Sequence, residues 1–235
     1  MALIIQGVSS PSTRSQFDHD LQSLREDILR LGSLVEEQIR HSVRSLRDRN
    51  LALGREVIAA DTRVNALRYK IEEDCLRIIA RQQPAARDLR MIIAATHMAS
   101  ELERIGDHAA GIATISVRIG EGPLIKPLID IPRMQDIVCD MVHRALDAYV
   151  HIDAAVAQQV AAMDDQVDEL YSQVLRELLT YMMQDAKTHN GAMYLLWVAH
   201  NLERIGDRAT NLCERVIFAA TGVLGDYKTF QPRDE

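Results

Sequence analysis

Two nearly identical segments of the sequence carry paired carboxylates that could bind a metal ion: ELERIGDHA at 101–109 and NLERIGDRA at 201–209. A glutamate and an aspartate stand four residues apart in each copy, as Glu103 with Asp107 and as Glu203 with Asp207. Residues i and i+4 share one face of a helix, where like charges destabilise the helix by roughly 0.2–0.5 kcal/mol. The glycine inside each copy adds a cost of about 1 kcal/mol relative to alanine. Because both costs recur at equivalent positions, we expect a compensating interaction, and a cation between the carboxylates would provide one.

A second polar pair precedes each of these segments. The stretch AADTRVNAL at 59–67 matches AAMDDQVDEL at 161–170 in outline, so that Asp61 and Asn65 correspond to Asp164 and Asp168. Facing helices would then gather oxygen ligands, which suit hard or borderline cations such as iron, manganese, magnesium or calcium. The candidate metal ligands are Asp61, Asn65, Glu103 and Asp107 in the first half and Asp164, Asp168, Glu203 and Asp207 in the second. With four carboxylates against three, the second set is expected to hold a cation more strongly.

Roles other than metal binding also fit these pairs. Arg104 and Arg204 lie inside the two motifs, so the acids could instead belong to a network of ion pairs on a solvated helix face. The two glycines could simply admit a neighbouring helix. A carboxylate-bridged metalloenzyme is a further alternative, but the Glu-x-x-His pairs of di-iron bundles do not occur in the sequence. We find no Gly-rich phosphate loop and no spacing typical of a Ser–His–Asp triad.

The elements that must position these residues are predicted to be long helices. Apolar residues recur at steps of three and four, aromatic residues make up only 4% of the chain, and Gly and Pro are scarce. The pattern predicts an all-α protein of six long helices, which form two tandem three-helix bundles related by an internal repeat of about one hundred residues. The predicted segments are a disordered lead-in at 1–13, a first bundle at 14–119, a linker at 120–131, a second bundle at 132–224 and a loose tail at 225–235.

Composition limits the class of function. The net charge of −7 argues against a nucleic-acid binder, and the acidic excess lies in residues 119–235. Three isolated cysteines argue against a disulfide framework or a zinc–thiolate site. The longest apolar run, AMYLLWVA at 192–199, is too short to span a bilayer, and the N-terminal segment lacks the basic region of a signal peptide. We therefore expect a cytoplasmic protein that meets a membrane only through its partners.

The ordered set of motifs resembles the PhoU family of bacterial phosphate-transport accessory proteins. The resemblance is carried by the doubled LERIGD, the AADTRVN element, RIIARQQPAARDLR at 77–90 and LLTYMMQD at 178–185, and it covers most of the chain. It implies two similar three-helix bundles in a cytoplasmic, non-enzymatic regulator.

The resemblance also implies partners and a cofactor. PhoU-like proteins couple the ATPase subunit of a phosphate ABC transporter to a phosphate sensor histidine kinase, and they keep phosphate-starvation genes off when phosphate is plentiful. Family members bind metal clusters, of iron or zinc, through paired acidic motifs that match Glu103 with Asp107 and Glu203 with Asp207 here. Dimers are common in the family, so a homodimer is expected.

Overall fold

The computed structural model describes residues 13–226, and within that range every regular element is a helix. The helices are α1 (Thr13–Arg47), α2 (Leu51–Gln82), α3 (Ala86–Ile119), α4 (Asp130–His151), α5 (Ala154–Ala161), α6 (Asp164–Gln184) and α7 (His189–Thr221), with a 3₁₀ turn, η1, at Ala186–Thr188. The all-α prediction is confirmed. The predicted lead-in at 1–13 and tail at 225–235 lie outside the described residues, except for residues 13, 225 and 226.

The fifth of the six predicted helices is interrupted, and its segment forms two helices, α5 and α6. Between α5 and α6 the backbone tightens at Met163, whose N–H donates to the carbonyl oxygen of Val160 at 3.0 Å and whose carbonyl oxygen accepts from the N–H of Gln166 at 3.0 Å. These bonds join residues three apart, as in a 3₁₀ turn. Neither Gly nor Pro occurs there, so the sequence does not mark the break. Its consequence is that Asp164 becomes the first residue of α6.

The two halves repeat each other in local detail. Asn50 caps α2 by accepting a hydrogen bond from the N–H of Leu53, and Asp153 caps α5 in the same way. The residues just before these caps, Arg49 and Ile152, both have positive φ angles, of 53° and 55°. The caps therefore place the first half in register with the second at a shift of 103 residues, from 50 to 153, which also relates Asp61 to Asp164.

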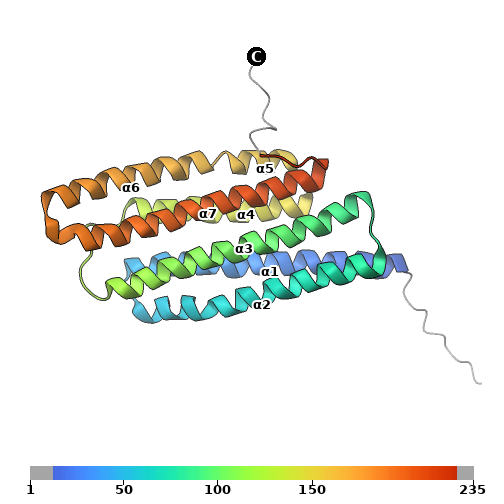
Figure 1. Ribbon diagram of the computed structural model, residues 1–235, viewed down its shortest axis with the longest axis horizontal. Helices are drawn as coiled ribbons and strands as arrows, with labels where there is room; N and C mark the ends of the chain where they lie inside the picture. The colour runs from blue at the N-terminus through green and yellow to red at the C-terminus, as the bar shows by residue number, and fades with distance from the viewer. Residues whose placement is uncertain (1–12, 227–235) are drawn as a thin grey trace, which may run out of the picture.

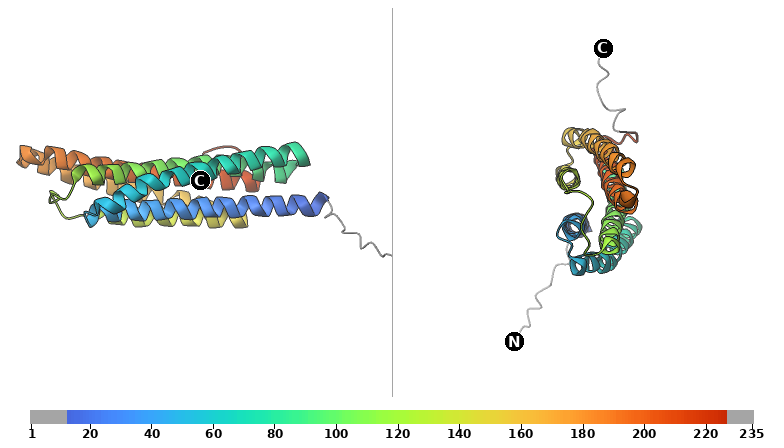
Figure 2. Two further views of the ribbon diagram at one scale, coloured as in Figure 1. Left: turned by 90° about the horizontal axis from the view of Figure 1, so that it is seen from below. Right: turned by 90° about the vertical axis from the view of Figure 1, so that its left-hand side faces the viewer.

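The helices form two layers. One layer contains α2, α3, α7 and the α5–α6 pair side by side, and α1 and α4 pack behind it (Figures 1 and 2). The most extensive contact joins α3 to α7, which run antiparallel at the centre of the first layer. Both halves contribute to one continuous core, which includes Ile39, Leu102, Val142 and Leu202, all of them inaccessible to solvent. The two bundles are thus fused through α3 and α7.

The linker is shorter than the sequence predicts and is held against the second half. The sequence predicts a linker over 120–131, whereas α4 begins at Asp130 and places Pro132 in its first turn, where a missing N–H costs nothing. The Lys126 ammonium, 8% exposed, pairs with the Glu177 carboxylate on α6. Among residues 13–226, no helix combines the length and apolar composition that crossing a bilayer would require.

Polar contacts between α3 and α7 are arranged about an approximate two-fold axis. Glu101 Oε2 accepts hydrogen bonds from Asn211 Nδ2 at 3.0 Å and from Arg208 Nη1 at 3.3 Å. On the other side of this axis, His108 Nδ1 lies 3.0 Å from Asn201 Oδ1. Since these residues come from the two LERIGD segments and their flanks, the contact brings both motifs to the middle of the molecule.

We predict that Glu101→Ala lowers the free energy of unfolding by about 2 kcal/mol, because it leaves two part-buried donors on α7 without their charged acceptor. Chemical denaturation measures this change. Asp48→Ala, which removes exposed pairs with Arg44 and Arg47, is the control and should cost much less, because solvent screens exposed ion pairs. Equal losses in the two variants would contradict a special role for the α3–α7 contact.

Candidate functional site

The first acidic cluster lies where α2 packs against α3. Asn65 Nδ2 donates a hydrogen bond to Asp61 Oδ2 at 2.8 Å, which holds the two predicted ligands of α2 together. Asp61 Oδ1 is buried and has no hydrogen-bond partner among residues 13–226. Burial, and then the charge of Asp107, raises the pKa of Asp61. The pKa of Glu103 is raised by the same two causes in the same order, so the structure brings Asp61, Glu103 and Asp107 within electrostatic reach of one another.

The second acidic cluster lies at the equivalent place, where α6 packs against α7. Burial raises the pKa of Asp164 to about 7, and the charges of Asp168, Asp207 and Glu203 add to the shift. Asp164 Oδ1 is another buried oxygen without a hydrogen-bond partner in the described part of the chain. Burial and then the charge of Asp207 also raise the pKa of Glu203. The four candidate ligands of this half are therefore within electrostatic reach of one another.

The two helix glycines make room for the inner carboxylates. A Cβ atom on Gly206 would lie 2.6 Å from Asp164 Oδ1, closer than such contacts occur. A Cβ atom on Gly106 would lie 2.9 Å from Gln38 Oε1 and 3.8 Å from Asp61 Oδ1. The glycines thus admit side chains of the neighbouring helices, and the polar atoms that lie against them lack hydrogen-bond partners among residues 13–226.

Arginines compensate part of the negative charge, on the outer side of the clusters. Arg204 Nη1 lies 2.6 Å from Asp207 Oδ2, so one ion pair of the alternative network is present. Arg68 stabilises the ionised form of Glu103 and also pairs with Glu72 at 2.9 Å. The inner carboxylate oxygens of Asp61 and Asp164 lie beyond these contacts. The structure therefore combines an ion-pair network outside with uncompensated oxygens inside.

A pocket of about 360 Å³ extends the second cluster. Besides Asp164 and Asp207 it is lined by Arg204, Asn211 and Glu214. Gly111 and Thr114 stand at the places of Asn211 and Glu214 in the first half, so the acidic stripe continues along α7 but not along α3. The two clusters therefore differ in their surroundings as well as in their number of carboxylates.

The residues of both clusters fit a cation in their donor chemistry. Buried carboxylate oxygens that lack hydrogen-bond partners among the described residues, and nearby acids whose charges raise the pKa of Asp164, are what a hard cation would stabilise. Within residues 13–226, however, no three His, Cys, Asp or Glu side chains already converge at the spacing of a bound ion. Metal binding at these residues is accordingly a proposal, and it requires the carboxylates to draw together.

Two neighbours of the clusters were not anticipated from the sequence. His200 Nδ1 lies 3.3 Å from Glu203 Oε2, and its ring packs against that of Tyr171. Its position three residues before Glu203 on one helix was a usable signal, because such residues share a face. Gln38 of α1 reaches Gly106 from outside both motifs. No periodicity or motif distinguishes Gln38, so only the packing of three helices reveals it.

The pKa of Asp164 leads to a prediction about pH. Because its folded-state pKa of about 7 lies above the ordinary value near 4, the folded protein binds the proton more tightly between these values. Stability should fall as pH rises through this window and remain low above it. Asp164→Asn removes the effect and should raise the free energy of unfolding at pH 8 by about 1–2 kcal/mol, after allowance for solvent screening of a half-exposed group.

Denaturation of both proteins in EDTA at pH 4 and pH 8 measures this difference. The gain from Asp164→Asn should be small at pH 4, where the aspartate is protonated in the folded state. An equal gain at both pH values would contradict the proposed burial of the carboxylate. Glu73→Gln, at an exposed position of α2, is the control and should leave the pH dependence unchanged.

The chain matches known proteins over most of its length. The PhoU domain family matches it twice, at residues 28–116 and 131–216. The phosphate-specific transport system accessory protein PhoU homolog of Pseudomonas aeruginosa is 39% identical over 210 residues, which are 88% of this chain and 86% of that protein. The accessory protein PhoU of Escherichia coli is 33% identical over 207 residues, with coverages of 88% and 86%.

Solved structures agree in fold. The crystal structure of PhoU from Pseudomonas aeruginosa superposes with a TM-score of 0.84 at 39% identity, covering 88% of this chain and 100% of the other. A PhoU structure from Streptococcus pneumoniae gives the same TM-score at 31% identity, with coverages of 90% and 100%. The double match of the family falls on the two helical halves that carry the two acidic clusters. The chain belongs to the PhoU family.

Proposed function

We propose that the protein is a negative regulator of phosphate uptake and of phosphate-starvation signalling. It acts as a cytoplasmic, non-enzymatic adaptor between the ATPase subunit of a phosphate ABC transporter and a phosphate sensor histidine kinase. Relatives named as accessory proteins of the phosphate-specific transport system support a regulatory role in phosphate uptake. Both partners are proposed from the family resemblance, and neither is a nucleic acid.

We further propose that the two acidic clusters bind metal ions, with iron or zinc as the leading candidates. The observation that carries this proposal is the pair of buried carboxylate oxygens, Asp61 Oδ1 and Asp164 Oδ1, that lack partners among the described residues at equivalent places in the two halves. Burying an ionised carboxylate without a counter-charge is costly, and a cation would remove that cost. Asp61, Asn65, Glu103 and Asp107 would hold one site, and Asp164, Asp168, Glu203 and Asp207 the other.

The physical role of these sites would be to fix helix pairs. Each cluster joins the outermost helix of the first layer to a central one, α2 to α3 and α6 to α7, and the central helices contact each other. Neutralising the repulsion within a cluster stabilises one packing of its helix pair. The outer helix faces would then present a defined surface to the transporter ATPase and to the kinase.

Charge reversal in the second cluster tests the regulatory proposal. Glu203→Lys places an ammonium beside Asp164 and Asp207 and should lower cation affinity at least about tenfold. In a bacterium lacking its own copy, this variant should also fail to repress a reporter of phosphate-starvation genes at high phosphate. Elemental analysis of the purified variant and reporter activity are measured on the same cultures.

Glu73→Lys is the matched control, since it reverses one charge at an exposed position of α2 away from both clusters. It should keep wild-type metal content and repression. If Glu203→Lys also kept both, the link between the clusters and regulation would be wrong. Recovery of the ATPase and the kinase on the tagged wild-type chain, from cells grown at high and low phosphate, tests the adaptor role itself.

We also propose a homodimer. The proposal extends the family resemblance to this chain, and the described surface has exposed large apolar side chains, among them Met183 (88%), Leu76 (69%) and Trp197 (45%), that a second copy could cover. Light scattering of the purified protein should give twice the 26.5 kDa mass of one chain. A mass of one chain at micromolar concentration would contradict the dimer.

A further inference from the structure

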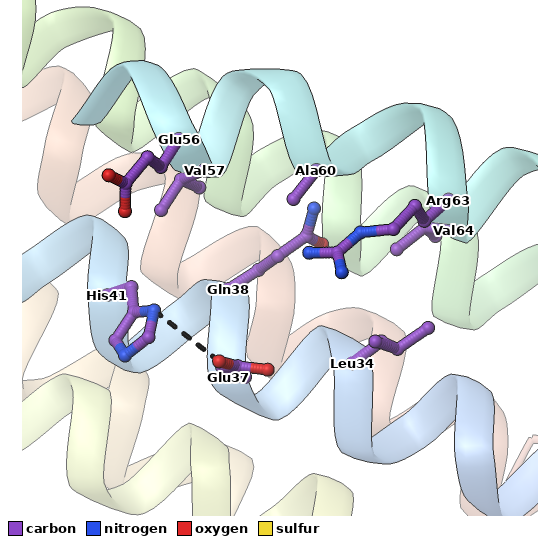
Figure 3. Close-up of a pocket in the computed structure, with 9 residues that line it drawn as sticks. All are labelled: Leu34, Glu37, Gln38, His41, Glu56, Val57, Ala60, Arg63 and Val64. Atoms are coloured by element: carbon purple, nitrogen blue, oxygen red, sulfur yellow. Dashed lines mark ion pairs between the residues drawn. The ribbon is translucent and has the colours of Figure 1, made fainter. Parts of the chain in front are cut away.

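A pocket opens between α1 and α2, on the side of the first half away from α7. It has a volume of about 130 Å³, and Gln38 extends from α1 into it, between the rim residues Glu37, Glu56 and Arg63 (Figure 3). Only 4% of Gln38 is exposed. Neither Nε2 nor Oε1 of this side chain has a hydrogen-bond partner among residues 13–226. A buried amide with both ends unsatisfied is unusual and calls for a partner that is bound to the protein.

The amide of Gln38 approaches the first acidic cluster from the side of α1. Its Oε1 atom and Asp61 Oδ1 both lie within 4 Å of the point where a Cβ of Gly106 would stand. Asp61 uses its other oxygen, Oδ2, to accept the hydrogen bond from Asn65. Polar atoms of α1 and α2 that lack partners in the described structure thus gather against the glycine of α3. A residue with a side chain at position 106 would fill this space.

We propose that Gln38 is a ligand of the first-half metal site, in which its carbonyl oxygen and Asp61 Oδ1 bind the same cation. This inference rests on the proposed binding of metal by the acidic clusters and extends it to a third helix. Hard cations accept neutral amide oxygens together with carboxylates, so the chemistry of Gln38 matches that of its neighbours. The α1–α2 pocket opens beside Gln38, and its rim holds Glu37 and Glu56 as well as Arg63.

The internal repeat shows that this ligand belongs to one half only. The shift of 103 residues that relates the caps of α2 and α5 places Met141 at the position of Gln38. Met141 is fully buried, and its thioether is a poor ligand for hard cations. The first half would therefore use three carboxylates and two amides, and the second half four carboxylates. The neutral amide oxygen of Gln38 adds one more ligand atom to the site that has fewer carboxylates. The two sites should therefore differ in their preference among metals.

The test measures the effect of Gln38→Met on metal binding by each cluster separately. Asp164→Asn with Asp207→Asn leaves only the first cluster intact, and Asp61→Asn with Asp107→Asn leaves only the second. Mn²⁺ is titrated into each background by calorimetry, with electron paramagnetic resonance as a second readout of the bound ion. Gln38→Met should raise the Kd for Mn²⁺ roughly tenfold in the first-cluster background and leave it unchanged in the second.

Thermal unfolding in EDTA separates a ligand from a structural residue. Because Gln38 buries an unsatisfied amide when no cation is present, Gln38→Met should unfold at the same or a higher temperature than the unsubstituted chain. Met141→Gln introduces the opposite change and should lower that temperature. If Gln38→Met instead lowered the unfolding temperature in EDTA, the amide would serve packing and the inference would be overturned.

The outcomes also separate this inference from the proposed function. Mn²⁺ binding in the first-cluster background with an unchanged Kd in Gln38→Met would overturn the role of Gln38 and leave metal binding by the cluster in place. No Mn²⁺ binding in the wild-type chain would overturn both. A tenfold loss that is confined to the first-cluster background supports both.

Discussion

The structure depends on how two helix pairs, α2 with α3 and α6 with α7, accommodate aspartates that are buried next to a glycine. At Gly106 and Gly206 the absence of a Cβ lets neighbouring side chains approach the helix backbone. At Gly206 the atom in this space is Asp164 Oδ1, and at Gly106 it is Gln38 Oε1, with Asp61 Oδ1 in ordinary contact beside it. Burial of the two aspartates near other acids raises the pKa of Asp61 and Asp164. Burial of these carboxylates near like charges lowers the local stability at equivalent places in the two halves. Such repeated costs are typical of binding sites, where a ligand supplies the missing interaction.

The α3–α7 contact determines how the two sites relate. Because these helices cross antiparallel with their LERIGD segments side by side, the clusters lie on opposite flanks of a single central pair (Figure 1). Polar contacts through Glu101 and His108 connect the helices on both sides of the approximate two-fold axis. A change in packing at either cluster is therefore applied to a helix that the other half also contacts. This arrangement would allow the proposed adaptor to present one defined surface to its two proposed partners.

Much of the fold follows from the sequence, and the reasons are local. Uninterrupted apolar periodicity predicts the long helices, Asn50 marks the start of α2, and Gly120 marks the end of α3. The break before Asp164 escapes prediction because no Gly or Pro causes it. The four polar pairs are predicted because i, i+4 spacing is a property of one helix. Gln38 is not, because its role arises only where α1, α2 and α3 meet. Sequence patterns thus describe single helices well and three-helix junctions poorly.

The central claim is that both acidic clusters hold cations. Diffraction at a metal absorption edge tests this claim most directly. Crystals of the full chain grown with Mn²⁺ should show anomalous difference peaks at both clusters, one beside Asp61 and Glu103 and the other beside Asp164 and Glu203. Crystals grown in EDTA should lack these peaks. The absence of a peak at both clusters in the Mn²⁺ crystals, with arginine side chains turned inward onto the carboxylates, would contradict the claim.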